Sequence, residues 1–389
     1  MTDVAPDIET DVLIVGAGPV GMTLALAIRA SGVPLRVRLL DARKRGSHAG
    51  DPRALALSHG TRQLLEPLNA WNAAAGTAIH DIHVSQAGGF GRTTLRREEQ
   101  RVPALGYVMR YRDLVAAIDI RLSDDIIIDS ADITSLQAHS DSIHVTLTRE
   151  GKQHTIRSRL LVHAEGTPTS EAGVATFDYH QHAVLAEVRP SPRHDHRAWE
   201  RFTSDGPLAL LPLGDDYSVV FTVPPGRADA LMAMNDGAFL TALQQQFGSR
   251  VTFTATSPRA RFPLALRLRK ELIDTRQVWI GNAAQTLHPV SGQGFNLGIR
   301  DAWELADKLL DPQYGSDPAD AGRLRAYAAG RRLDRAGSAA FTDGIVRIFS
   351  NDLAPLRLAR GLGLLALDVC PQARKFVAGR MISGARAWP

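Results

Sequence analysis

The stretch VWIGNAAQTLHPVSGQGFNLGIRDAWELADKLL, residues 278–310, combines a short strand, a glycine-rich loop and a helix. Its first three residues are apolar and are followed by Gly281, as in a buried strand that meets a loop. From Asn296 onward, apolar residues recur at helical spacing, so the loop is predicted to lead into a helix. A helix start has unpaired backbone N–H groups and the positive end of the helix dipole, and it therefore favours negative charge. By itself, the stretch is equally compatible with an ordinary tight connection.

A second glycine cluster near the N-terminus changes that balance. The apolar run at 11–15 is followed at once by GAGPVG at 16–21 and then by a helical pattern. A second apolar run at 35–40 ends at Asp41. This order of strand, G-x-G-x-x-G, helix, strand and acid is the fingerprint of dinucleotide binding.

Each residue of the fingerprint has a physical task. Gly16 permits the tight turn, Gly18 lets the backbone approach a pyrophosphate, and Gly21 lets helix and strand pack closely. Asp41 can accept hydrogen bonds from a ribose diol. Arg43 leaves a contact to a 2′-phosphate open. The sequence therefore predicts a site for an adenine dinucleotide.

The composition is that of a globular protein and excludes several functional classes. The chain has 389 residues, of which 44% are hydrophobic and 22% charged, and this length is enough for two packed domains. The net charge is only +4, and no dense Lys/Arg block with interleaved aromatics occurs, which argues against nucleic-acid binding. Cys370 is the only cysteine, so a reducing compartment fits. The acidic N-terminus lacks a signal pattern, and we expect a cytoplasmic protein that can touch the inner membrane from its surface.

Strand and helix patterns divide the chain into a split cofactor domain, a β-rich insertion and a helical tail. Short strand patterns between 126 and 164 and a β-rich segment at 182–223 separate the two glycine-rich regions. We therefore expect a parallel-sheet domain interrupted by an antiparallel one. The predicted boundaries are 1–80, 100–178 and 277–350 for a discontinuous cofactor domain, 81–99 and 179–276 for a substrate-binding β domain, and 351–389 for the tail.

The chain resembles the FAD-dependent aromatic hydroxylases in five segments, which read GAGPVGMTLALAI, LLDAR, DPRALALSHGTRQLL, DGPLALLPL and GNAAQTLHPVSGQGFNLGIRD. The similarity extends from Asp11 to about residue 340 and is greatest to the hydroxylases of ubiquinone biosynthesis that act on 2-polyprenylphenols and 6-methoxyphenols. It implies an α/β fold with a Rossmann-like FAD-binding domain of the glutathione-reductase type. An antiparallel β domain for the substrate and a C-terminal helical segment would complete this fold.

The resemblance also implies which residues hold FAD. The ADP half would be held by Gly16, Gly18, Gly21 and Asp41, and Pro19, Arg43 and Gly166 also belong to the predicted cofactor-binding set. Arg53 and Arg112 would lie near the pyrophosphate and flavin, and Asn282 would face the ribitol and pyrophosphate. The isoalloxazine would be lined by Pro289, Gly292, Gln293, Gly294, Phe295 and Asn296. Where relatives commonly have Asp-Gly and a nearby Arg, this chain has Glu165-Gly166 and no following base.

The chemistry implied by the resemblance is insertion of one oxygen atom of O2 into a prenylated phenol. In the family, reduced flavin reacts with O2 to give a flavin hydroperoxide, and the electron-rich ring attacks its distal oxygen. The protein holds the ring and flavin in reach, excludes water and places positive charge near the flavin N1 edge. Only one complete fingerprint is present, which indicates that NAD(P)H visits transiently. The sequence does not identify a protein base for the phenol proton.

Histidines offer weaker candidates. His288 precedes Pro289 and is a weak candidate for an acid or base, but a histidine that orders the loop is the favoured interpretation. Two H-x-H pairs, at 180–182 and 194–196, have spacing that occurs in metal sites. Neither has convincing third and fourth ligands, so no metal site is predicted.

Alternatives remain for the substrate and the tail. The segment at 353–381 mixes leucines with arginines, which fits a packed helix or a surface for a membrane or for partner enzymes. The substrate could instead be a small soluble phenol or a polyketide. The chain could also be a flavin-bound structural subunit of a quinone-biosynthesis complex. A plain nicotinamide dehydrogenase would leave the block at 282–296 unexplained.

Overall fold

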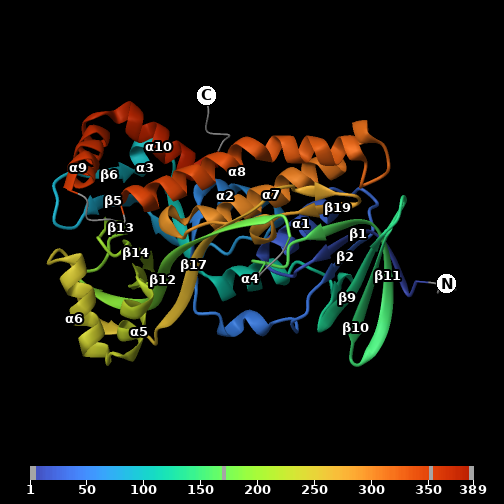
Figure 1. Cartoon of the computed structure of the whole chain (residues 1–389), viewed down its shortest axis with the longest axis horizontal. Coiled ribbons are helices and arrows are strands. Elements are labelled where there is room, and N and C mark those ends of the chain that lie inside the picture. Colours follow the sequence, from blue (N-terminus) through green and yellow to red (C-terminus); the bar gives the residue numbers. More distant parts are fainter. Residues whose placement is uncertain (1–5, 169–171, 350–353, 385–389) are drawn as a thin grey trace.

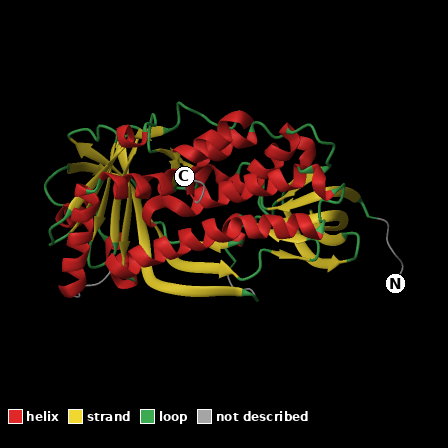
Figure 2. Cartoon of the chain, turned by 90° about the horizontal axis from the view of Figure 1, so that it is seen from above, coloured by secondary structure: helices red, strands yellow, loops and turns green. Residues whose placement is uncertain are grey.

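A computed structural model of the chain describes residues 6–168, 172–349 and 354–384. Two large sheets lie at opposite ends of an elongated molecule, with helices between and above them (Figure 1, Figure 2). Parts of the predicted domains and of the tail lie outside the described residues, namely 1–5, 169–171, 350–353 and 385–389.

The first large sheet is built around β1. It contains β1 (Ile8–Val15), β2 (Val37–Leu40), β8 (Ile127–Ile128), β9 (Ala131–Ala138), β10 (Ile143–Arg149), β11 (Lys152–His163), β18 (Ile273–Asp274) and β19 (Gln277–Trp279). The strands β19, β11, β1, β2 and β8 are neighbours in that order and are all parallel. The strands β9, β10 and β18 add antiparallel pairs. The parallel order confirms the predicted Rossmann-like α/β fold.

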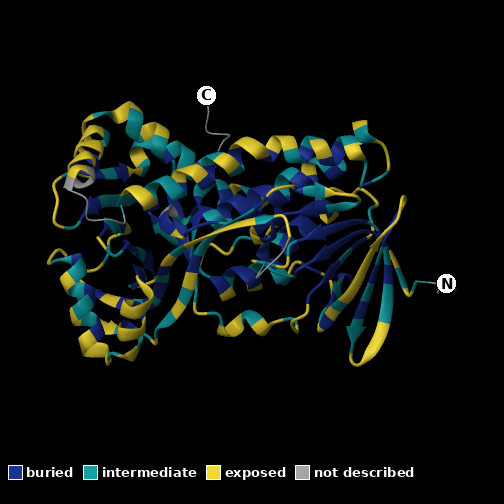
Figure 3. Cartoon of the chain, in the orientation of Figure 1, coloured by how far each residue is buried: buried dark blue, intermediate teal, exposed yellow. Residues whose placement is uncertain are grey.

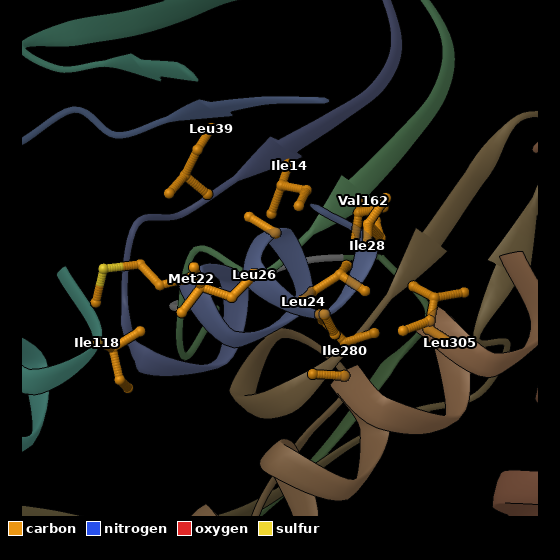
Figure 4. Close-up of a cluster of buried hydrophobic side chains, with 14 of the residues drawn as sticks. Ile14, Met22, Leu24, Leu26, Ile28, Leu39, Ile118, Val162, Ile280 and Leu305 are labelled. Carbon is orange, nitrogen blue, oxygen red and sulfur yellow. The ribbon is translucent and has the colours of Figure 1, made fainter. Parts of the chain in front are cut away.

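Both faces of this sheet are covered. Val12 and Ile14 of β1 belong to the core shared with the helices, whereas Leu13 and Val15 pack against β9 and β10. Successive strand residues point to opposite faces, so a strand covered on both sides needs an uninterrupted apolar run. Figure 4 shows Ile14 and its strand neighbours beside the apolar side chains of α1. The covering helices are α1 (Pro19–Ala30), α4 (Tyr111–Asp119) and α7 (Gln293–Leu310).

The second large sheet supplies the other wall of the molecule. It contains β5 (Asp81–Gln86), β6 (Arg92–Arg96), β12 (Val174–Ser191), β13 (Arg197–Phe202), β14 (Pro207–Leu213), β15 (Asp216–Val223), β16 (Thr252–Thr256), β17 (Ala260–Arg269) and β20 (Gln285–Thr286). Its pairs are antiparallel, as predicted, except that β5 and β13 run parallel. These two strands come from distant segments, so no hairpin turn fixes their direction. The helices α5 (Pro225–Ala233) and α6 (Asp236–Phe247) pack on this sheet.

A small antiparallel sheet contacts the second large sheet. Its order is β3-β7-β4, and Ile79 and Val108 from it pack against Ala198 and Leu213 of the large sheet. The elements here are β3 (Ala54–Ser58), β4 (Thr77–Ile79), β7 (Gly106–Arg110), α2 (His59–Leu65) and α3 (Arg97–Gln100). Short 3-10 turns occupy Ser47–Gly50, Glu66–Leu68, Asp124–Ile126, Gly281–Ala283, Val290–Gly292 and Pro312–Tyr314. The division into cofactor and substrate domains at the stated residues stays a prediction.

Three helices close the described chain: α8 (Ala321–Phe349), α9 (Ala354–Val369) and α10 (Pro371–Ser383). The last predicted helical segment is thus divided, because Pro371 lacks the N–H that a continuing helix needs. Helix α8 runs along the upper edge of the molecule in this view, and α8 and α9 carry exposed residues on their outer sides (Figure 3). None of the helices in the described part of the chain has both the length and the apolar composition to span a bilayer.

Candidate active site

The first glycine cluster forms the turn between β1 and α1. Gly16 has a φ of 107°, and a Cβ there would lie 2.3 Å from the carbonyl oxygen of Ala164. A Cβ on Gly21 would lie 2.1 Å from the carbonyl oxygen of Gly16. Both positions therefore need glycine for the fold. Gly18 differs, because its nearest neighbour for a Cβ would be the Tyr111 hydroxyl at 3.9 Å.

The second glycine cluster forms the turn before α7. Gly292 precedes the helix with a φ of 62°, and a Cβ there would lie 2.9 Å from Ala56 Cβ. Among the described residues, no side chain caps the first turn of α7, and none caps the first turn of α1 after Gly18. Each helix start therefore presents backbone N–H groups without a side-chain acceptor.

Both turns open onto one cavity of about 460 Å³. Ten residues of the predicted cofactor-binding set line it: Gly18, Pro19, Arg43, Arg53, Gly166, Asn282, Pro289, Gly292, Gly294 and Phe295. Apolar residues of the second large sheet line the other side, among them Ala209, Leu211 and Val220. The tertiary structure thus brings the two distant glycine turns together against an apolar strand wall.

An adjoining cavity of about 310 Å³ is lined by Asp41, the acidic residue that ends the fingerprint. Asp41 and Arg112 line it, and Arg43 lines both cavities. The Asp41 carboxylate accepts the Ala17 N–H at 2.8 Å and the Arg43 N–H at 2.8 Å. Burial raises the pKa of Asp41, but the hydrogen bonds and charge of Arg43 outweigh this effect and bring the pKa below its ordinary value. Asp41 is therefore a charged acceptor at neutral pH.

A second arginine is held in the cavity wall by an acid and an aromatic ring. Arg53 Nε donates to Asp51 at 2.9 Å, and the guanidinium lies 4.5 Å from the centre of the Tyr111 ring. These contacts keep a positive charge between the two glycine turns. Tyr111 also lines the cavity and was not anticipated from the sequence.

Asn296 lines a neighbouring cavity of about 60 Å³ and not the cavity of about 460 Å³, and its place at the isoalloxazine stays a prediction. Its amide oxygen accepts the Ser58 N–H at 2.8 Å and the Thr61 hydroxyl at 2.7 Å. Its amide nitrogen donates to the carbonyls of Ala56 at 2.9 Å and Gly292 at 2.7 Å. The side chain therefore ties the turn before α7 to β3 and α2.

His288 and Gln293 are also absent from the wall of the main cavity. His288 Nδ1 accepts the Val290 N–H at 3.1 Å, and the ring makes an edge contact with Tyr179. Burial lowers the pKa of His288 to about 3, so the ring is neutral at physiological pH. Its contacts favour the loop-ordering role over acid–base catalysis. Gln293 donates to the Met381 carbonyl at 3.2 Å and lines two other cavities beside α10, of about 60 and 540 Å³.

The H-x-H pair at 194–196 is engaged in loop contacts. His194 Nε2 lies 2.7 Å from the Gly214 carbonyl, and His196 Nδ1 lies 3.0 Å from the Ala78 carbonyl. His180 is exposed at a bulge in β12. Within residues 6–168, 172–349 and 354–384, no group of three or more His, Cys, Asp or Glu side chains is arranged to hold a metal ion.

Two acidic side chains reach the main cavity. Glu165 lies in the segment that departs from the family pattern, and its Oε1 is 2.9 Å from His163 Nδ1. Glu200 of β13 lines the apolar side and was missed by sequence reasoning. The signal was present, because alternation in β13 places Glu200 on the same face as Ala198 and Phe202.

These residues fit FAD. The open space at Gly18 lets a pyrophosphate approach the backbone, and the uncapped starts of α1 and α7 favour negative charge. Arg43 and Arg53 add positive charge, and Asp41 can accept a ribose hydroxyl. The two adjoining cavities provide an elongated site for an elongated cofactor.

Comparisons with known proteins agree with this fit. The family described as FAD binding domain matches residues 9–340. Ubiquinone hydroxylase UbiL of Rhodospirillum rubrum is 34% identical over 96% of this chain and 90% of that protein. The 3-demethoxyubiquinol 3-hydroxylase of Escherichia coli is 29% identical over 95% of this chain and 98% of that protein. The fold is that of p-nitrophenol 4-monooxygenase PnpA from Pseudomonas putida, with a TM-score of 0.76 at 15% identity over 97% of this chain and 100% of that one. The chain therefore belongs to the FAD-binding domain family and is an FAD-dependent monooxygenase, as its motifs predicted.

Proposed function

We propose that this monooxygenase hydroxylates a prenylated phenol in ubiquinone biosynthesis, with NAD(P)H as electron donor and O2 as co-substrate. The similarity to ubiquinone hydroxylases along nearly the whole chain supports the pathway. The observation that carries the reaction is that both glycine turns and an apolar strand wall line one cavity. An apolar wall opposite a cofactor cradle suits an aromatic ring with a hydrocarbon substituent.

The predicted cofactor residues would divide FAD between the two cavities. Asp41 would accept a ribose hydroxyl, and Gly18 and the start of α1 would receive the pyrophosphate. Gly292 and Gly294 at the start of α7 would face the isoalloxazine, where the Gly294 N–H and the helix start would stabilise negative charge, because the Gly292 N–H donates to the Pro289 carbonyl. When bound, FAD supplies the redox chemistry by accepting a hydride from NAD(P)H and activating O2.

The protein's own residues would position the ring and exclude water. Ala209, Leu211 and Val220 offer an apolar surface without hydrogen-bonding groups on their side chains. Such a wall holds the ring in reach of the cofactor and strengthens the electrostatic effect of Arg53, because water is excluded. The small side chain of Ala209 leaves space for a substituted ring.

Turnover assays test this proposal. The purified protein is loaded with FAD, and NAD(P)H oxidation is measured with 2-prenylphenols and with unprenylated phenols, while mass spectrometry detects addition of one oxygen. We expect the prenylated phenols to stimulate oxidation and to be hydroxylated. Equal turnover of unprenylated phenols would instead favour a small soluble substrate. Tight FAD binding without substrate-stimulated oxidation would indicate a structural subunit. Deletion of the gene should cause the phenol precursor to accumulate.

We also propose that α9 contacts the membrane surface that holds a polyprenylated substrate. Leu358, Leu362, Leu365 and Val369 are exposed and recur at helical spacing, so they form one apolar stripe. Vesicle flotation tests this contact with the Leu362→Glu/Leu365→Glu variant. Ile120→Glu, which changes an exposed apolar residue after α4, is the matched control. Equal flotation of wild type and the α9 variant would refute the membrane contact.

A further inference from the structure

Glu200 is a carboxylic acid in the apolar wall of the cavity. It lies on β13, where its register partner on β14 is Ala209, and the partner of Ala209 on β15 is Val220. All three residues line the cavity. The Glu200 carboxyl thus stands at the end of an apolar row that crosses three strands. Ala209 beside it is too small to cover it.

The carboxyl of Glu200 has no hydrogen-bond or ion-pair partner within the described part of the chain. Its Oε1 atom is buried and makes no hydrogen bond to any described residue. Glu187, on strand β12 of the same sheet, shows the usual arrangement, because its carboxylate is paired with Arg110 at 2.9 and 2.6 Å. Buried polar atoms in proteins are nearly always hydrogen-bonded, so an unpaired one beside a cavity points to a partner that arrives with the ligand.

The strands beside Glu200 bring no charge to it. Its neighbours are Ala209 on β14 and Val84 on β5. His83 and Arg201 lie on the other face of the sheet, where His83 packs on Trp199 and Arg201 donates to the Gln246 carbonyl. The remaining ionisable residues of the cavity wall are Arg43, Arg53, Tyr111 and Glu165, and the three that carry charge have partners in Asp41, Asp51 and His163.

Burial in this environment raises the pKa of Glu200 to about 7, because an apolar wall disfavours the charged form. The acid and the carboxylate forms are therefore both accessible near neutral pH. A general base works best with a pKa near the working pH, since it must be deprotonated before the step and able to accept a proton during it.

We propose that Glu200 is the base that accepts the proton of the substrate's ring hydroxyl. This role rests on the proposed phenol hydroxylation. The Glu200 carboxylate takes the hydroxyl proton, which leaves the electron pair of the broken O–H bond on the ring oxygen and makes the ring more electron-rich. After oxygen insertion, the proton returns to the same oxygen, and the replaced ring hydrogen leaves as a proton. The overall balance is one phenol, O2, NAD(P)H and a proton giving the hydroxylated phenol, water and NAD(P)⁺.

The test compares the FAD-loaded wild type with Glu200→Gln, Glu200→Asp and the exposed control Glu271→Gln. We expect wild-type kcat to rise with pH through about 7. Glu200→Gln should lose this ionisation and at least about 100-fold in kcat at pH 8, with FAD content unchanged. Glu200→Asp should keep the ionisation at a lower kcat, and Glu271→Gln should match the wild type. A more acidic, fluorinated phenol should partly rescue Glu200→Gln. A Glu200→Gln enzyme within about threefold of wild type, or with the same ionisation, would overturn the role.

A second experiment, which measures substrate binding, distinguishes failure of this inference from failure of the proposed function. A prenylphenol is titrated into the oxidised, FAD-loaded protein and followed by flavin absorbance. In the wild type, binding should tighten by about tenfold as the pH rises through 7, because a carboxylate accepts the hydroxyl more strongly than a neutral acid does. In Glu200→Gln, binding should not change with pH. If the wild type binds the phenol with this pH dependence but never hydroxylates it, the proposed function fails and the Glu200 contact stands. If both proteins bind alike at every pH, the Glu200 contact fails.

Discussion

The Asp301 carboxylate of α7 accepts the backbone N–H of Gly281 at 2.9 Å, so the helix that begins at the cavity also fixes the turn before Asn282. Its other oxygen accepts Arg331 Nε of α8 at 2.7 Å, and both side chains are buried. Arg331 in turn contacts Asp334, which pairs with Arg300 at 2.7 Å. The buried ion pairs that join α8 to α7 therefore also hold the turn at Gly281, next to the candidate active site.

Removing Asp301 should destabilise the protein and weaken its cofactor site. In Asp301→Ala, the Gly281 N–H loses its acceptor and Arg331 keeps only part of its neutralising charge. We expect a loss of about 3 kcal/mol in the free energy of unfolding, measured by urea denaturation, and weaker FAD binding. Asp307→Asn, an exposed position on the same helix, should change the stability by less than about 0.5 kcal/mol. A change below about 1 kcal/mol in Asp301→Ala would contradict this interpretation.

Alanine substitutions at Gly16 and Gly18 should separate folding from cofactor binding. Gly16→Ala places a Cβ against the Ala164 carbonyl at a positive φ, so the apoprotein should melt several degrees lower. Gly18→Ala meets no close protein atom, so the apoprotein should melt within about 2 °C of wild type. Its methyl group would occupy space meant for the pyrophosphate, and the Kd for FAD should rise at least about tenfold. Differential scanning calorimetry and flavin fluorescence titration measure the two effects. Unchanged FAD affinity in Gly18→Ala would place the cofactor elsewhere.

Glu200→Gln should stabilise the apoprotein above neutral pH. Because the folded-state pKa of about 7 lies above the ordinary value of 4.5, the folded protein binds more protons between these values. Wild-type stability therefore falls as the pH rises from about 4.5 to 7, and the loss persists above that range. The variant should gain up to about 3 kcal/mol relative to wild type at pH 8 and nothing at pH 4. Denaturation curves that differ equally at both pH values would show that Glu200 ionises normally.

His288→Asn should leave the pH dependence of kcat between 6 and 9 unchanged. Because burial lowers the pKa of His288 to about 3, the unfolded chain binds more protons below pH 6.5, and wild-type stability falls on acidification from about 6.5 towards 3. The variant has no histidine at this position to be protonated on unfolding. Its free energy of unfolding relative to wild type should therefore rise by about 3 kcal/mol when the pH is lowered from 7 to 4. Urea denaturation at both pH values measures the difference. Loss of an ionisation from the kcat profile would instead identify His288 as an acid or base.

The sequence by itself determined the features that depend on local chain geometry. A glycine such as Gly16 is required by its backbone angle and its close neighbour, and the continuous apolar run of β1 follows from burial on both faces. For the same reason, the sequence alone predicted the strand–turn–helix units and the acidic residue after β2, Asp41. The parallel sheet and its FAD-binding character followed from them.

Only the tertiary structure decided which distant residues share an environment. It gave Asn296 four hydrogen bonds inside the protein, and it paired β5 with β13 in parallel, although no turn connects them. It also placed Glu200 in an apolar wall, where its buried Oε1 has no hydrogen-bond partner among the residues that the structure describes. The charge state of a carboxyl depends on solvent and neighbours within a few ångströms, and those are set by packing between segments far apart in the chain.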